Sequence, residues 1–292
     1  MNESRIPRFL AIDGGGTRCR LSFCSGGAVR SVETGPANVS TDLDGAVIAI
    51  KTGLKELAEL SGFDEASLLE APAFVGLAGM SGKTIKDDLR ARLSFARIRI
   101  EDDRPAALRG ALGSKDGVIA HCGTGSFFAS QIDGRMKFAG GWGSVLADEA
   151  SASWLGKSAL RMTLAVVDQT APPSELTEKI LRDYDGATGI VRFAGSAGPL
   201  EFGALAPLVT AFAKRDDAVA QAIMGKGAQH IAEVLPKIGW KSGLPICLTG
   251  GLGPEFKPYL PANMRTDIIE PIAAPLDGAL MLAQDFATEI AA

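Results

Sequence analysis

The stretch FLAIDGGGT, from Phe9 to Thr17, decides the fold. Its first four residues are apolar and predict a short buried strand, which the three glycines interrupt. Residues 20–23 then alternate between polar and apolar side chains, so the segment 18–24 is expected to be a second strand. Asp13 therefore ends a strand, beside a glycine-rich turn that joins two strands.

A glycine-rich turn of this kind can hold a phosphate group. Glycine lets backbone N–H groups approach the phosphate closely, and a carboxylate at the strand end can hold Mg²⁺ through its water shell. The P-loop motif is absent, and the dinucleotide motif fails because Cys19 stands where its last glycine belongs. Both of those motifs lead into a helix, whereas this turn leads into a strand. A plain tight turn between strands is the structural alternative.

The surrounding sequence predicts an α/β unit. Gly26 and Gly27 predict a hairpin turn into a third strand over 28–34. An apolar stripe with helical spacing follows, with Asp42 as its N-cap and Gly62 as its C-terminal stop. The remaining elements expected in this unit are a strand at 73–78, a helix at 83–93, a strand at 98–101 and a helix at 105–112.

The strand, glycine turn and strand recur around Gly123. Strands are expected at 117–120, 127–132 and 136–138, and another at 244–248 before a third glycine turn at Thr249–Gly253. Helices are expected at 149–168, 174–184, 200–214, 216–238 and 276–289. The repetition predicts two similar α/β halves with a cleft between them, joined near residues 113–115.

Composition excludes several classes of protein. The chain has 292 residues, enough for two domains, and its net charge of −4 with no basic cluster argues against a nucleic-acid partner. The apolar run at 9–12 is too short for a signal or membrane segment, so a soluble cytoplasmic protein is expected. The four cysteines form no C-x-x-C pair, which argues against zinc or a disulfide framework. Cys122 and Cys247 are expected to be buried packing residues.

Taken together, these segments resemble the N-acetylglucosamine/glucosamine kinase family of the actin-like ATPase and sugar kinase superfamily. The most specific segment is Gly140-Gly-Trp-Gly143 followed by Asp148-Glu149. The other matching segments are Asp13-Gly-Gly-Gly-Thr17, Gly35-Pro-Ala-Asn38, Gly76-Leu-Ala-Gly79, Asp102-Asp103 with Ala106-Ala107-Leu108, Gly123-Thr-Gly-Ser126, Thr249-Gly-Gly251 and Pro275-Leu-Asp-Gly278-Ala279.

The resemblance implies two ribonuclease-H-like domains, at 1–113 and 114–292, with ATP and an amino sugar in the cleft. It implies ATP and Mg²⁺ as cofactors and a possible homodimer, with no nucleic-acid or membrane partner. The last helix, 276–289, would pack back on the N-terminal domain.

The resemblance also implies roles for individual residues. Asp13 would hold Mg²⁺, through water, and Asp103 would be the catalytic base that takes the proton of the attacking hydroxyl, which fits what phosphoryl transfer requires. The implied ATP-binding residues are Gly14, Gly15, Gly16, Thr17, Gly123, Thr124, Gly125, Ser126, Gly250 and Gly251. The implied sugar-binding residues are Asn38, Asp103, Gly141, Trp142, Asp148 and Glu149.

Several of these residues have structural alternatives. Asp103 or Asp102 could be a helix N-cap, with Asp102 favoured for that role, and Asp148 could cap the helix that follows it. Trp142 could be a packing anchor, and His121 is expected to be a packed strand residue. The family usually has glycine where this chain has Ala147 and Ala150. Those two methyl groups could narrow the sugar pocket or tilt the start of the helix.

Two other functions remain open at this point. An ATPase that activates a radical dehydratase would need cysteines close together to hold an iron–sulfur cluster, and Cys122 has no second cysteine nearby in the sequence. A sugar- or nucleotide-sensing module would keep the cleft without turnover. A glycosidase built on the pairs Asp102-Asp103 and Asp148-Glu149 would leave the glycine turns unexplained.

Overall fold

The chain folds into two compact units, described here from a computed structural model that covers residues 8–80 and 82–292. Unit 1 comprises the chain up to Ser114 together with Pro271–Ala292, and unit 2 is Lys115–Glu270. Residues 1–7 of the expected first domain lie outside the described residues. The chain crosses from unit 1 to unit 2 and returns for its last helix.

The sheet of unit 1 has five strands in the order β3-β2-β1-β4-β5. The strands β1, β2 and β3 pair antiparallel, whereas β4 and β5 add to β1 in parallel. Their bounds are β1 Arg8–Gly14, β2 Cys19–Ser25, β3 Ala28–Thr34, β4 Ala73–Leu77 and β5 Ile98–Glu101. The carboxyl ends of β1, β4 and β5 therefore lie at one edge of the sheet, where Asp13 is found.

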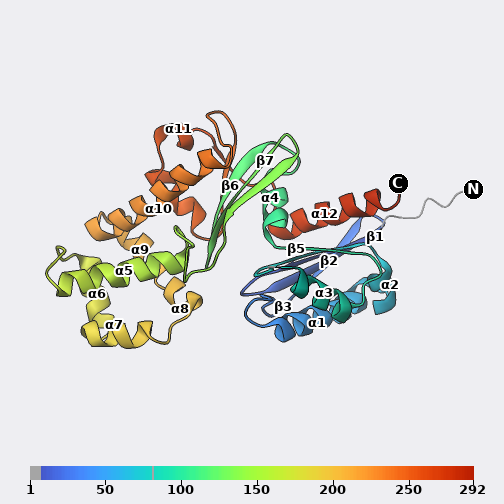
Figure 1. Cartoon of the computed structure of the whole chain (residues 1–292), viewed down its shortest axis with the longest axis horizontal. Coiled ribbons are helices and arrows are strands. Elements are labelled where there is room, and N and C mark those ends of the chain that lie inside the picture. The colour runs from blue at the N-terminus through green and yellow to red at the C-terminus, as the bar shows by residue number, and fades with distance from the viewer. Residues whose placement is uncertain (1–7, 81) are drawn as a thin grey trace, which may run out of the picture. The chain divides into compact units, whose positions relative to one another are not determined.

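Helices cover both faces of this sheet. The first face packs against α1 Leu43–Ser61, with α2 Glu65–Glu70 and α3 Lys83–Leu93 beside it, and the second packs against α12 Pro275–Glu289 and α4 Arg104–Leu112 (Figure 1). Cys19 belongs to the core under α1 and Cys24 to the core under α12. The two cysteines therefore face opposite sides of β2, as their spacing predicts.

The ends of α1 and the seat of α12 follow from single residues. The Asp42 carboxylate accepts a hydrogen bond from the Gly45 amide at 2.8 Å, and Gly62 ends α1 with a φ of 74°. Both caps were predicted. A Cβ placed on Gly278 would lie 2.0 Å from the carbonyl oxygen of Ala106, so α12 and α4 approach closely enough to require glycine there.

The sheet of unit 2 repeats the topology of unit 1 in the order β10-β9-β6-β7-β8. Again three antiparallel strands are extended by two parallel ones. The bounds are β6 Gly117–Cys122, β7 Ser126–Ile132, β8 Arg135–Gly140, β9 Ile246–Thr249 and β10 Ile268–Ile269. In both units a glycine-rich turn joins the two central antiparallel strands, which is the repetition that the sequence indicates.

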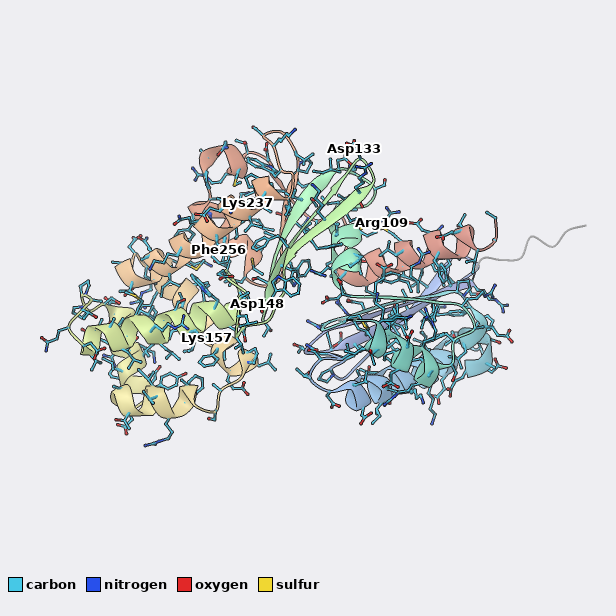
Figure 2. All side chains as sticks on the ribbon, in the orientation of Figure 1. Arg109, Asp133, Asp148, Lys157, Lys237 and Phe256 are labelled. Atoms are coloured by element: carbon cyan, nitrogen blue, oxygen red, sulfur yellow. The ribbon has the colours of Figure 1, made fainter. Side chains whose placement is uncertain are left out.

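The helices of unit 2 form one hydrophobic core with its sheet. They are α5 Ala152–Val167, α6 Glu175–Asp183, α7 Gly186–Ala194, α8 Pro199–Gly203, α9 Ala206–Ala213, α10 Ala218–Lys237, the 3-10 helix η1 Gly253–Tyr259 and α11 Ala262–Arg265. Phe256 of η1, labelled in Figure 2, is fully buried against α10, where a Cβ on Gly227 would lie 2.6 Å from its ring. Among all described residues, no helix is long and apolar enough to cross a membrane.

Three corrections concern the helices of unit 2. The helix expected over 200–214 is two helices, because Pro207 lies in the first turn of α9 and a proline there disfavours a continuous helix from the preceding residues. The helix expected from residue 149 begins only at Ala152, because Asp148 and Ala150 have positive φ angles. The helix α7 was not expected, since Gly186 and Gly189 weaken its sequence pattern.

Candidate functional site

In unit 1, a buried ion pair lies at the carboxyl end of β1. Asp13 is 7% exposed and faces Arg20 across the antiparallel pair of β1 and β2. The Nη2 of Arg20 lies 2.5 Å from Oδ2 of Asp13. Burial raises the pKa of the Asp13 carboxyl, and the Arg20 guanidinium opposes that shift. The sequence pattern placed Arg20 on a strand but gave no sign of this contact, which depends on the strand register.

Two adjacent carboxylates at the end of β5 have different surroundings. Both oxygens of Asp102 are occupied by Arg104, at 2.9 Å from Nε and 2.8 Å from Nη2, and Oδ1 also accepts from the Arg104 backbone amide. Asp103 stands at the N-cap position of α4 without a capping hydrogen bond from its side chain. Asp102 thus has a structural role, because its carboxylate holds Arg104 at the start of α4. The Asp103 carboxylate neither pairs with Arg104 in this way nor caps the helix.

The fold raises the pKa of the Asp103 carboxyl toward neutrality. Burial, followed by the negative charges of Asp13 and Asp102, raises its pKa to about 7. Gly76 lies on β4, the strand between β1 and β5, and pairs with Asp13. A Cβ on Gly76 would lie 3.4 Å from the Asp102 carbonyl oxygen. A group with a pKa near neutrality can take a proton efficiently at physiological pH.

The glycines after Asp13 differ in how much space a side chain would have at each position. A Cβ on Gly14 would lie 2.5 Å from Leu77 and 2.9 Å from the Ala37 side chain, so this position is sterically closed. A Cβ on Gly16 would meet nothing within 4 Å, and Gly16 and Thr17 are exposed. The exposed residues Gly16 and Thr17 can therefore contact a ligand, whereas Gly14 is packed against its neighbours.

Asn38 is held by the segment that contains it. Its Oδ1 accepts hydrogen bonds from the backbone amide and the hydroxyl of Ser40, at 3.0 and 2.8 Å. Gly79 has a φ of 76°, and a Cβ there would lie 2.3 Å from the same oxygen. The side-chain oxygen is therefore engaged, and the Nδ2 donors are the part of Asn38 that can bind a ligand.

In unit 2, the second glycine turn is braced by the start of α5. The amides of Ala152 and Ser153 donate to the carbonyl oxygens of Gly123 and Thr124, at 2.8 and 3.3 Å. The Ser126 hydroxyl donates to the carbonyl oxygen of Glu149 at 2.6 Å. These bonds fix the carbonyl groups of Gly123 and Thr124 against the start of α5.

Asp148 lies against this turn and does not cap α5. The N-cap of α5 is Ser151, whose Oγ accepts from the Trp154 amide at 3.1 Å, so the capping alternative for Asp148 is wrong. Asp148 is 6% exposed with a φ of 67°, and its Oδ1 accepts from the Gly143 amide at 3.2 Å. A Cβ on Gly125 would lie 2.7 Å from Oδ2, so Asp148 and the second turn form one assembly.

The segment before Asp148 is exposed and held by its backbone. Gly141 has a φ of 76°, and its amide donates to the Ser126 carbonyl at 2.9 Å. Trp142 is 76% exposed within the described structure, which excludes a role as a packing anchor within unit 2. The Lys157 ammonium group, on α5 near Asp148 (Figure 2), donates to the Ser144 carbonyl and lies 5.2 Å from the centre of the Phe202 ring.

The two alanines that replace the family's glycines differ in position. Ala150 is fully buried in the core of unit 2, with a φ of 65°. Its methyl group therefore contributes to packing and does not narrow a ligand pocket. The left-handed backbone explains why glycine is the usual residue there, since alanine costs about 1–2 kcal/mol in that conformation. Ala147 is partly exposed.

The third glycine turn, after β9, packs directly on the second. Gly250 has a φ of 77°, and a Cβ there would lie 2.4 Å from the Cys122 carbonyl oxygen and 2.9 Å from the Gly123 amide nitrogen. The Leu252 amide donates to that same carbonyl oxygen at 2.9 Å. The structure thus brings the turns at 123–126 and 250–251 together in unit 2, as it brings Asp13, Asp103 and the turn at 14–17 together in unit 1.

The cysteines offer no metal centre. All four are buried and none is in a disulfide, and burial raises the pKa of the Cys122 thiol to about 12. Within the described ranges, no group of three His, Cys, Asp or Glu side chains could hold a metal ion. A Mg²⁺ ion would not require such a group, because it commonly takes one or two carboxylates together with substrate phosphates.

Comparison with known proteins identifies relatives along the whole chain. The chain is 25% identical over 279 residues to the glucosamine kinase GspK of Vibrio cholerae, covering 94% of this chain and 95% of that protein. It is 27% identical over 274 residues to the N-acetyl-D-glucosamine kinase of Dictyostelium discoideum, covering 83% and 84% of the two chains.

A solved structure supports the same relationship. The crystal structure of a protein from Chromobacterium violaceum, described as a candidate N-acetylglucosamine kinase, superimposes with a TM-score of 0.83 at 28% identity, covering 96% of this chain and 99% of that one. The α/β fold with two mixed sheets is therefore that of the sugar kinases and actin-like ATPases. Residues 10–283 match the model of one family, and the chain belongs to it: the BadF/BadG/BcrA/BcrD ATPase family.

Proposed function

We propose that this protein is an ATP-dependent kinase that transfers the γ-phosphate of ATP to a hydroxyl group of an amino sugar. Membership of an ATPase family and the names of its relatives, which are kinases of glucosamine and N-acetylglucosamine, support this function. The single observation that carries it is Asp103, a carboxylate with a pKa of about 7 beside Asp13 and free of the Arg104 pair that occupies Asp102. By family analogy the acceptor is the 6-hydroxyl.

Each group of residues has a role in this proposal. Asp103 takes the proton from the sugar hydroxyl as that oxygen attacks phosphorus, which leaves ADP as the departing group. Asn38, Gly141, Trp142, Asp148 and Glu149 bind the sugar together with Asp103. The turns at Gly14–Thr17, Gly123–Ser126 and Gly250–Gly251 hold the nucleotide phosphates and the adjacent part of ATP.

The residues present fit a magnesium ion beside Asp13. One oxygen of Asp13 is engaged by Arg20, and the other is available to a water of the ion's shell. Mg²⁺ bound with ATP would neutralise charge on the transferred phosphoryl group. The two units as ribonuclease-H-like domains and the homodimer are further parts of the proposal that come from the family resemblance. The cytoplasmic location is a further part that was expected from the sequence itself.

A sugar panel tests this function directly. ADP release would be followed with Mg-ATP and, in turn, glucosamine, N-acetylglucosamine, N-acetylmannosamine, glucose and no sugar. The proposal predicts that one or more amino sugars stimulate release well above the blank, and that the product carries one phosphate ester by mass. A flat panel from protein that binds ATP would contradict the kinase and favour a sensing module.

A further inference from the structure

His121 and Thr249 are a cross-strand pair at the carboxyl ends of two neighbouring parallel strands, β6 and β9. Nδ1 of His121 and Oγ1 of Thr249 are 3.1 Å apart, which is hydrogen-bonding distance. Gly123 lies two residues after His121, and Gly250 directly follows Thr249. The hydrogen bond therefore joins the strands at the points where the second and third glycine turns begin.

The two turns have little freedom to move independently. The space beside Gly250 is closed by the backbone of Cys122 and Gly123, and the Leu252 amide donates to the Cys122 carbonyl. A change in the separation of β6 and β9 at His121 would therefore alter the direction of the amides in both turns. Donors that bind a charged group well must be aimed before the ligand arrives.

The imidazole of His121 is itself fixed. It stacks on the Phe127 ring, with centroids 4.9 Å apart and planes 18° apart, and Phe127 belongs to the strand that leaves the second turn. A Cβ on Gly123 would lie 3.2 Å from Nε2, so the ring also borders the turn. Burial lowers the pKa of His121 to about 4, and the ring is neutral at physiological pH.

We propose that His121 is a positioning residue, which, bonded to Thr249, fixes the spacing of the two nucleotide-binding turns. This inference rests on the proposed function in one respect, the assignment of both turns to ATP. It predicts that the pair affects the affinity for nucleotide and leaves the KM for the sugar unchanged. Simple packing of His121 would instead be satisfied by any ring of similar size.

The test compares variants that keep or remove the bond. His121→Phe keeps the stacked ring without either nitrogen, and Thr249→Val keeps the shape without the hydroxyl. His121→Asn and Thr249→Ser each retain a hydrogen-bonding group at the pair. The dissociation constant for a non-hydrolysable ATP analogue with Mg²⁺ would be measured by calorimetry, and thermal midpoints without nucleotide would report folding.

We expect His121→Phe and Thr249→Val each to weaken the analogue about 3–10-fold, the worth of one hydrogen bond. The double variant should be no weaker than the worse single variant, because both changes remove the same bond. Thr249→Ser should keep an affinity for the analogue close to that of the wild type, and His121→Asn should keep part of it. Unchanged affinity in the two disruptive variants, or losses that add in the double variant, would overturn the inference.

The measurement separates this inference from the proposed function. Wild-type protein that binds the analogue but phosphorylates no amino sugar would refute the kinase, while the variants would still test the pair. Wild-type protein that does not bind the analogue would overturn the inference. Should His121→Phe fail to fold, the comparison of Thr249→Val with Thr249→Ser decides the question. Thr249→Val keeps the branched shape without the hydroxyl, and Thr249→Ser keeps the hydroxyl without the branch.

Discussion

Arg20 Nη2 lies 2.5 Å from Asp13 Oδ2, in a pair that the register of β1 and β2 brings together at the edge of the unit 1 sheet. The guanidinium is the positive charge that opposes the rise in the pKa of the buried Asp13 carboxyl. The electrostatic state of the candidate site in unit 1 therefore depends on a residue outside the glycine motif.

Removing this guanidinium should destabilise the fold. Arg20→Gln leaves Asp13 buried without its charged partner, and we expect a loss of about 1–3 kcal/mol in the free energy of unfolding. Urea denaturation at neutral pH measures it. Arg18→Gln is the matched control, because Arg18 and its partner Glu33 are both more than half exposed and lie 3.4 Å apart. Its effect should stay within about 0.5 kcal/mol, and equal losses in the two variants would contradict this account.

A substitution at Gly250, in the third glycine turn, should lower the affinity for nucleotide. Gly250→Ala would place a Cβ 2.4 Å from the Cys122 carbonyl oxygen at a φ of 77°, so the turn must shift and nucleotide affinity should fall at least about tenfold. Gly225→Ala, on α10 and outside the glycine turns, meets nothing within 4 Å and is the control, with affinity expected to change little. Titration with a fluorescent ATP analogue compares them. A normal affinity for Gly250→Ala would show that the second and third turns are not packed as described.

Ala150→Gly should leave sugar preference unchanged, because the Ala150 methyl group is buried in the unit 2 core. Relief of left-handed strain, about 1 kcal/mol, should offset the loss of one buried methyl group, about 0.8 kcal/mol. The ratio of kcat/KM values for glucosamine and N-acetylglucosamine is the measurement. A marked change in that ratio would place Ala150 at the sugar after all.

The pH dependence of the reaction should follow Asp103. A base must be deprotonated, so kcat/KM should rise with pH through about 7, the pKa that burial and two neighbouring acids give this carboxyl. Stability should show the opposite trend. Between the unperturbed pKa of 3.8 and about 7, the folded protein binds more protons than the unfolded chain, so stability falls as pH rises.

Asp103→Asn should remove the fall in stability that this carboxyl causes between those pH values. Chemical denaturation at several pH values would show it as a smaller difference between pH 4 and pH 7 than in the wild type. A slope identical to that of the wild type would mean that Asp103 has an ordinary pKa in the folded protein.

The sequence was sufficient to predict elements whose signals are local. The strands between Phe9 and Thr34 are confirmed to within about two residues, and both ends of the helix between Asp42 and Gly62 are confirmed, because side-chain period and capping chemistry fix them. The repetition of a glycine turn between antiparallel strands is likewise confirmed in both units. The family and the fold class followed from the resemblance, whose most specific segment is Gly140-Gly-Trp-Gly143 followed by Asp148-Glu149.

What the sequence could not supply depends on contacts between distant residues. The pair of Arg20 with Asp13 requires strand register, and the contact of His121 with Thr249 joins residues 128 positions apart. The capping alternative for Asp148 was wrong because a positive φ at Asp148 and at Ala150 delays the helix to Ala152. Nothing in the local pattern of those alanine and aspartate residues predicts a left-handed backbone.

The assignment of Asp103 as the base is tested most directly by ADP release at neutral pH, with the preferred amino sugar, for the wild type, Asp103→Asn and Asp102→Asn. We predict that Asp103→Asn lowers kcat by about 10²–10⁴-fold while the affinity for an ATP analogue stays close to that of the wild type. Asp102→Asn weakens the Arg104 pair and removes one of the two charges that raise the pKa of Asp103, so it should retain most of the turnover at neutral pH. Undiminished turnover in Asp103→Asn, or an equal loss in both variants, would contradict the assignment.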